Sequence, residues 1–144
     1  MGTLSGRVAI VTGGSLGIGL AAAAALGREG AAVTICSSRQ EHLEAARQTL
    51  AESGVDVDAM RADVSKAADI DDLVERVAAV HGGIDILVNA AGIQRYGTVV
   101  ETDEATWDEV MDVNIKAMYL TSRRVIPHMR TRGGAMRPLP CGRS

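Results

Sequence analysis

The feature that most constrains this chain is a fourfold alternation of short apolar runs with longer helical patterns. The apolar runs, which read as strands, occupy residues 7–13, 31–37, 55–63 and 84–92. The stretches with helical periodicity follow them at residues 17–30, 39–54, 65–83 and 102–134. Strands that alternate with helices across short connections form parallel sheets with right-handed crossovers. The sequence therefore predicts an α/β fold, a doubly wound parallel sheet with helices on both faces.

The helical patterns also predict which side chains are buried. Apolar residues recur at helical spacing at Leu43, Ala46 and Leu50 in the second helix, and at Ile70, Leu73, Val77 and Val80 in the third. Ser65 is expected to cap the third helix. The last helical stretch begins with a capping signal and an acidic first turn, and we expect it to bend or be stressed at Pro127.

Length and composition limit the class of protein. A chain of 144 residues with 47% hydrophobic residues is long enough and apolar enough for one globular domain. Phenylalanine is absent, so aliphatic residues must build the core, as suits a parallel sheet covered by helices. Nothing approaches a membrane span or a signal peptide, and we expect a cytoplasmic protein. Two cysteines and three scattered histidines form neither a disulfide framework nor a metal site, and Cys36 is expected to be buried.

Charge is distributed unevenly along the chain. Residues 1–112 hold all 18 acidic groups, whereas residues 113–144 hold seven basic groups and no acid. One interpretation is a basic tail for nucleic acid or a membrane surface. The other is basic residues late in a helix, which the helix dipole favours. We prefer the second, because no aromatic platforms accompany the charge, and we expect neither nucleic acid nor membrane as a partner.

A glycine-rich turn, TGGSLGIG at residues 12–19, joins the first strand to the first helix. Free backbone N–H groups and the positive end of the helix dipole meet at such a turn, which makes it a site for a pyrophosphate. Glycines there let the backbone approach the phosphates. The alternative is a purely structural turn. We assign cofactor binding in this turn to Gly13, Ser15, Leu16, Gly17, Ile18 and Gly19.

The end of the second strand indicates which dinucleotide fits. Many dinucleotide sites place an acid about 20 residues after the turn, where it binds the ribose 2′-hydroxyl. This chain has Ser37, Ser38 and Arg39 there instead. A guanidinium binds phosphate oxygens, so we predict NADP rather than NAD. Alternatively, Arg39 is a solvated residue at the start of the next helix.

Asp63 and Val64 end the third strand, at the sheet edge where ligands collect in such folds. The Asp63 carboxylate is suited to accept a hydrogen bond from an adenine amino group. It is equally suited to cap the following helix together with Ser65, and the two roles are compatible.

These motifs together resemble the short-chain dehydrogenases/reductases. The resemblance rests on the spacing of the glycine turn, Asp63-Val64, Asn89-Ala90-Ala91-Gly92 and Asn114, and covers roughly residues 5–134. It implies a Rossmann-like fold, with strand order 3-2-1-4 for the strands present. It also implies hydride transfer between NAD(P)H and a small-molecule alcohol or carbonyl.

The resemblance gives roles to two further motifs. The turn of Asn89, Ala90, Ala91 and Gly92 would stabilise the central sheet and border the cofactor, although a purely structural turn accounts for much of this. Asn114 would hold a water in the proton relay, and a structural hydrogen bond alone is the alternative. Its expected neighbours on one helical face are Trp107, Met111, Met118, Val125 and Met129.

The family's chemistry needs a serine, a tyrosine and a lysine four residues after it, and this chain lacks that set. Tyr96 and Tyr119 have the wrong context, and we assign neither a catalytic role. Residues 1–134 therefore read as an incomplete NAD(P)-binding domain, and 135–144 as an irregular tail, which one hypothesis takes to be out of frame. We expect a truncated and inactive oxidoreductase; the alternative is a non-catalytic dinucleotide-binding module acting through a partner. Substrate and oligomeric state cannot be read, although full-length relatives are homo-oligomeric.

Overall fold

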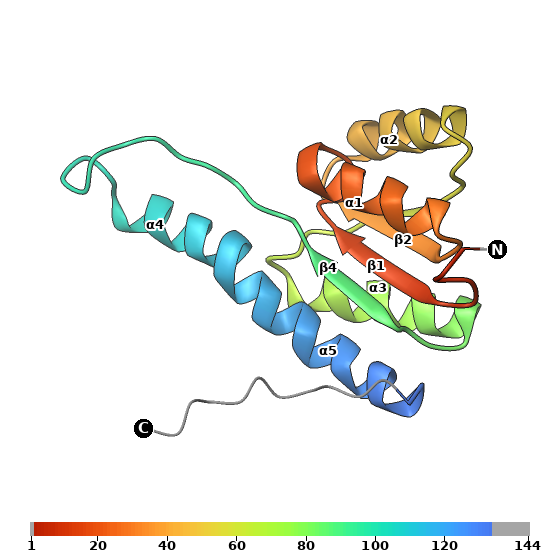
Figure 1. The fold of residues 1–144 in the computed structure, drawn as a ribbon. Helices are drawn as coiled ribbons and strands as arrows, with labels where there is room; N and C mark the ends of the chain where they lie inside the picture. Colours follow the sequence, from red (N-terminus) through yellow and green to blue (C-terminus); the bar gives the residue numbers. More distant parts are fainter. Residues whose placement is uncertain (1, 134–144) are drawn as a thin grey trace, which may run out of the picture.

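The computed structural model describes residues 2–133, so the tail predicted at 135–144, with Cys141, lies outside the described residues. Four strands form one parallel sheet in the order β3-β2-β1-β4, which confirms the predicted topology (Figure 1). The strands are β1 (Val8–Thr12), β2 (Ala32–Ser37), β3 (Asp58–Arg61) and β4 (Ile86–Asn89). β3 and β4 are shorter than the runs at 55–63 and 84–92, because only their central residues pair with a neighbouring strand.

Helices cover both faces of the sheet, as predicted (Figure 1). One face packs against α1 (Gly17–Arg28) and α2 (Gln40–Glu52), and its core contains Val11, Ile35 and Leu43. The other packs against α3 (Ala67–His81) and α5 (Ala117–Thr131), with Ile10, Leu73 and Val125 in its core. Each core is built almost wholly from aliphatic side chains, which agrees with the expectation that aliphatic residues build the core of this sheet and its helices.

The predicted helix faces are mostly confirmed. Leu43, Ala46 and Leu50 of α2 are buried, as are Ile70, Leu73 and Val77 of α3. Val80 is 65% exposed, so its assignment to the stripe was wrong; the buried fourth member of α3 is Val74. Val74 lies four residues after Ile70 and three before Val77, so it shares their face, whereas Val80 lies at the rim of a surface groove.

The start of α3 also differs from the prediction. The N-cap position is Lys66, with no side-chain capping bond, so Ser65 is not the cap. Ser65 instead donates its backbone N–H and its hydroxyl to Asp63 Oδ1, over 3.0 and 2.7 Å. The side chain that was expected to serve the helix therefore serves the preceding turn, which is a common competing role for serine.

The stretch predicted as one helix over 102–134 consists of three segments. These are α4 (Glu104–Met111), a π-helical turn η1 (Asp112–Lys116) and α5. Asp103 caps α4 by accepting a hydrogen bond from the Thr106 N–H over 2.8 Å, as the capping signal predicted. The interruption falls at the π-turn, while α5 continues through Pro127.

The apolar face predicted around Asn114 is only partly packed. Val125 is buried and Met129 packs against the core, but Trp107 is 59% exposed, and Met111 and Met118 are also exposed. The reason is visible in the topology: α4 projects beyond the sheet and has no buried residue, so nothing among the described residues covers it (Figure 1). No helix within residues 2–133 is both long enough and apolar enough to cross a membrane.

Candidate functional site

A groove of about 770 Å³ lies at the carboxyl ends of the strands, where ligands bind in open α/β sheets. It is lined by the glycine turn, the end of β2, the residues after β3 and the residues after β4. The predicted cofactor residues that line it are Gly13, Ser15, Leu16, Gly17, Ile18, Ser37, Ser38, Arg39, Asp63, Val64, Ala90, Ala91 and Gly92. Segments far apart in the sequence thus meet at one concave surface.

Gly19 and Asn89 were predicted in the same set but do not line the groove. A Cβ on Gly19 would lie 2.1 Å from the carbonyl oxygen of Gly13, so Gly19 lets α1 pack directly beneath the turn. Asn89 faces α5, where the Thr121 hydroxyl donates to Asn89 Oδ1 over 2.7 Å. Both residues act from behind the groove wall, and sequence spacing alone could not separate this position from one that faces the ligand.

The glycine turn is tight on its protein side and open on its groove side. Gly13 has φ +63°, and a Cβ there would lie 2.6 Å from Cα of Ala91. Gly17 has φ +52°, yet a Cβ there would meet no atom within 4 Å. The turn therefore needs glycine at 13 for both conformation and space, whereas at 17 it needs the left-handed conformation alone.

The N-terminus of α1 opens at this turn without a side-chain cap. The N-cap residue is Leu16, no side-chain hydrogen bond caps the helix, and the first turn carries no acid. The first N–H groups of a helix lack intrahelical partners and carry the positive end of its dipole. An anion placed in the groove at Gly17 would therefore meet N–H donors and favourable charge.

The β2 end of the groove gathers basic and hydroxyl side chains. Arg39 is the N-cap of α2, which also has no side-chain cap, and its backbone N–H donates to Ser37 Oγ over 3.3 Å. Arg61 Nε donates to the Ser38 carbonyl over 3.1 Å and so holds this turn against β3. His42, one helical turn after Arg39, lines the same end of the groove.

Cys36, at the floor of the groove, is fully buried. Burial raises the pKa of its thiol to about 12, against a smaller opposing contribution from a backbone hydrogen bond at Gly13. The thiol is therefore neutral at physiological pH and has no nucleophilic character. Cys36 acts as a small apolar residue under the turn.

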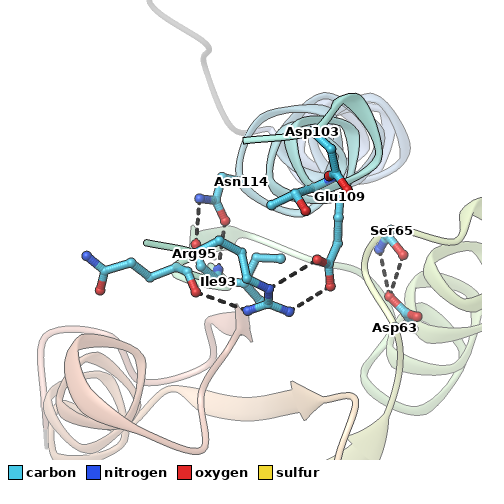
Figure 2. Close-up of polar contacts among 9 residues, drawn as sticks. Asp63, Ser65, Ile93, Arg95, Asp103, Glu109 and Asn114 are labelled. Carbon is cyan, nitrogen blue, oxygen red and sulfur yellow. Dashed lines mark hydrogen bonds and ion pairs between the residues drawn. The ribbon is translucent and has the colours of Figure 1, made fainter. Parts of the chain in front are cut away.

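Asp63 is held in a turn at the β3 end of the groove (Figure 2). Its Oδ1 accepts both bonds from Ser65, and its own backbone N–H donates to Asp69 Oδ2 over 2.8 Å. Lys66 Nζ lies 3.9 Å from Oδ2. The carboxylate is thus oriented by its own turn, and only Oδ1 is fully engaged within the described residues.

The turn after β4 is tied to the end of β1. The Thr12 hydroxyl oxygen lies 3.3 Å from the N–H of Ala90 and 3.4 Å from that of Ala91, and accepts from both. The Ala90 N–H also donates to the Thr12 carbonyl over 3.2 Å. These bonds fix the backbone of the β4 turn beside the glycine turn.

Asn114 lies in the π-turn and bonds to the strand turn rather than to its own helix (Figure 2). Its Oδ1 accepts from the Ile93 N–H over 2.8 Å, and its Nδ2 donates to the Ile93 carbonyl over 2.9 Å. The expectation that this half-buried amide must find partners is confirmed. The contacts of the side chain are those of a structural tie, and its predicted role in a proton relay stays a prediction.

An ion pair holds the same loop a few residues later. Arg95 Nη2 and Nε donate to the two carboxylate oxygens of Glu109 in α4, over 2.7 and 3.1 Å (Figure 2). Neither tyrosine lies in the groove: Tyr96 is 90% exposed, and the Tyr119 hydroxyl accepts from Arg123. This agrees with leaving both tyrosines without a catalytic role.

Several residues of the groove wall were missed from the sequence. They are Cys36, His42, Ala62, Ile93, Gln94 and Val113. Each neighbours a predicted residue in sequence or lies one helical turn from it, so extending each motif by one to three positions would have found them. The π-turn that brings Val113 to the groove has no recognisable sequence signal.

Comparison with known proteins gives a consistent match over this part of the chain. The family model described as short chain dehydrogenase matches residues 7–136. Dehydrogenase/reductase SDR family member 4 of Oryctolagus cuniculus is 41% identical over 132 residues, covering 91% of this chain and 51% of that protein. The chain therefore spans about half the length of the curated relatives it matches.

Solved structures match equally well. A metagenomic short-chain oxidoreductase in complex with NADP aligns with a TM-score of 0.84 and 38% identity, covering 90% of this chain and 59% of that one. L-sorbose reductase from Gluconobacter frateurii, complexed with NADPH and L-sorbose, aligns with a TM-score of 0.82 and 37% identity, covering 90% and 50%. With the family model matched over nearly the whole chain and the fold shared, this chain belongs to the short-chain dehydrogenase family.

Proposed function

We propose that this chain binds NADP(H) in the groove and forms the nucleotide-binding part of an oxidoreductase acting on a small-molecule alcohol or carbonyl. The observation that carries the proposal is the groove itself. Its walls combine an uncapped helix N-terminus at Gly17, a basic end at Arg39 and His42, and a fixed turn at Ala90 and Ala91. A dinucleotide needs these features in this order along one groove.

The residues present fit such a cofactor. The pyrophosphate would lie over Gly17, where the backbone leaves open space and free N–H donors. The adenine would lie beside Val64 with its amino group toward Asp63. The nicotinamide end would reach the turn at Gly92 and the side chain of Val113.

Preference for NADP over NAD rests on the charge at the β2 end. Ser38, Arg39 and His42 line the groove there, and Asp63 is the only acid among its lining residues. A guanidinium and an imidazole suit a 2′-phosphate, whereas a ribose 2′-hydroxyl is normally bound by a carboxylate at this position. The solved relatives described with NADP and NADPH are consistent with this choice.

A cofactor held by these residues would supply the hydride chemistry. The chain's own residues bind and orient the cofactor, and the hydrogen bonds of Thr12 and Asn114 hold the groove wall in place. The 144 residues contain no Tyr-x-x-x-Lys, so this polypeptide assayed alone is expected to bind cofactor without turnover. We include in this proposal the role of Asn114 in holding a water of a proton relay.

Fluorescence titration of the 144-residue chain with NADPH and with NADH tests the proposal. We expect NADPH to bind more tightly, and Arg39→Gln to weaken NADPH binding about tenfold, since it removes a charge-assisted hydrogen bond. NADH binding should change little in that variant. Arg28→Gln is the matched control, because Arg28 ends α1 and lies outside the groove.

The outcomes separate the parts of the proposal. Equal affinity for both cofactors, unchanged in Arg39→Gln, would remove the NADP preference and leave dinucleotide binding intact. Absence of binding by either cofactor would remove the proposed function. Turnover of an alcohol or ketone by this chain would show that its chemistry does not depend on Tyr-x-x-x-Lys.

A further inference from the structure

A second groove, of about 370 Å³, lies beside strands β2 and β3, between helices α2 and α3. It is bounded by Thr34 of β2, Asp58 of β3, Arg47 of α2, and Arg76, Val77 and His81 of α3. We call it the lateral groove. It shares no lining residue with the groove at the carboxyl ends of the strands. Nothing in the proposed dinucleotide site accounts for it.

The lateral groove opens at the edge of the sheet. β3 is the terminal strand in the order β3-β2-β1-β4, so its outer side has no strand partner among residues 2–133. α2 and α3 lie on opposite faces of the sheet, and each contributes an arginine, Arg47 and Arg76, to the lining of the lateral groove. Side chains from both helix layers therefore converge on one opening.

Thr34 gives the lateral groove a polar floor. The residue is only 4% exposed, and its hydroxyl makes no hydrogen bond to any described residue. The hydroxyl oxygen nevertheless keeps some access to solvent. In the described part of the chain, no fully buried side-chain nitrogen or oxygen atom lacks a hydrogen-bond partner. A buried hydroxyl without a protein partner is uncommon, and the remaining access of Thr34 is to the lateral groove.

The rim of the lateral groove carries positive charge. Arg47 and Arg76 are exposed, and neither has a carboxylate within 4 Å in the described part of the chain, unlike Arg95 or Arg124. The carboxylate on the wall, Asp58, is engaged by His81 over 2.9 Å. Two guanidinium groups from two different helices thus lie at the rim without a carboxylate partner among the described residues, while the Asp58 carboxylate is paired with the His81 ring.

We propose that the lateral groove binds a small anion that carries carboxylate or phosphate oxygens. The anion accepts hydrogen bonds from the guanidinium groups of Arg76 and Arg47 and from the Thr34 hydroxyl. Arginine matches the geometry of such oxygens better than lysine does, and two arginines on separate elements select a ligand that reaches both. The site is independent of the dinucleotide groove and does not rest on the proposed function.

NMR titration of the full 144-residue chain with succinate and, separately, with inorganic phosphate tests this proposal. We expect saturable amide shifts at Thr34, Ala59 and residues 77–81 with at least one of the two probes. Arg76→Gln and Thr34→Val should each raise the dissociation constant about tenfold, because each removes a hydrogen bond to a charged group. Thr34→Val conserves side-chain shape, so the fold is retained while the hydroxyl is lost.

Arg28→Gln is the control for loss of a surface charge and should leave the titration unchanged. Arg39→Gln distinguishes the two grooves: shifts confined to Gly17 and Ser38 that disappear in this variant would place the anion in the dinucleotide groove. That result would overturn the proposal. So would the absence of saturable shifts at the lateral groove, or shifts there that Arg76→Gln and Thr34→Val leave unchanged.

Discussion

β1 and β4 are neighbouring strands of one sheet, yet they are held by different forces. All five residues of β1 are buried, whereas all four residues of β4 are only half-buried. β1 has a strand on each side, while β4 pairs with β1 alone among the described residues. β1 is therefore stabilised mainly by apolar burial and by its glycine turn.

β4 depends instead on polar ties at its two ends. Before its first residue, Asp85 accepts from the Val8 N–H over 2.9 Å and from Arg7 and Arg132 over 3.0 Å each. At its last residue, Asn89 accepts from the Thr121 hydroxyl. The difference shows how a terminal strand with little apolar cover can be fixed by hydrogen bonds to its neighbours. The next four experiments are designed to separate the two modes.

Replacement of Gly19 by alanine should have the largest effect. The added Cβ would collide with the Gly13 carbonyl, so α1 must move away from β1, at a cost of about 3 kcal/mol in the free energy of unfolding. Chemical denaturation followed by circular dichroism measures this. Gly54→Ala is the control: its φ is +79° in open space, so only backbone strain of about 1 kcal/mol applies. Equal losses in the two variants would contradict close packing beneath the turn.

The paired valines Val11 of β1 and Val88 of β4 provide the direct comparison. Val11 is fully buried, and Val11→Ala should lower the free energy of unfolding by about 2.5 kcal/mol through lost burial and a cavity. Val88→Ala should lower it by about 1 kcal/mol, since Val88 is half-buried. Denaturation midpoints at constant slope give both values. A larger loss at Val88 would show that β4 depends on burial as β1 does.

Asp85 makes the stability of β4 dependent on pH. Burial raises its pKa, but the bonds from the Val8 N–H, Arg132 and Arg7 outweigh it, so the pKa is lowered overall. The carboxylate therefore stabilises the fold above its unfolded pKa of about 3.9, and this is lost as pH falls through the lower folded value. Asp85→Asn should reduce stability at pH 7 by about 2 kcal/mol.

The role of Asp85 is tested by measuring the free energy of unfolding of the parent chain and of Asp85→Asn between pH 2 and pH 7. The parent chain should lose stability at the acid end of this range, and the difference from Asp85→Asn should shrink there. A constant difference at every pH would mean that the carboxylate charge is not what ties β4 to β1 and to Arg132.

Thr121→Val should have the smallest effect, about 1 kcal/mol. It removes the donor to Asn89 Oδ1 while keeping the shape of the buried side chain. Hydrogen exchange should show faster opening of β4 amides than of β1 amides. Thr131→Val is a suitable control, because that hydroxyl bonds only within α5, to the Pro127 carbonyl.

Much of the fold was predictable because its signals are local. The glycine turn, the alternation of elements and the buried faces of α2 and α3 follow from residue spacing, and the strand order follows from the family resemblance. The errors at Val80 and Trp107 share one cause. Each concerns where an element stops being covered by a neighbour, and that depends on parts of the chain distant in sequence. The error at Ser65 is local, because its side chain bonds to Asp63 in the preceding turn instead of to the helix.

The candidate site divides in the same way. Sequence spacing identified most of the groove wall, since the carboxyl ends of parallel strands must lie along one edge of the sheet. It could not show that Gly19 and Asn89 face away from the groove. The lateral groove was not predictable at all, because Thr34 and Arg76 belong to separate patterns with no spacing in common.

By itself, the sequence determined the alternation of strands and helices and the position of the glycine turn, because these depend on local backbone chemistry and on the order of elements. Its motifs also carried the resemblance that gives the family and the strand order. Only the tertiary structure decided that a π-turn aims Asn114 at Ile93 and that polar ties hold β4. It alone brought to one edge of the sheet a buried threonine hydroxyl and two arginines that pair with no carboxylate within residues 2–133. These features arise from contacts between distant segments, whose geometry is set only when the helix layers close on the sheet.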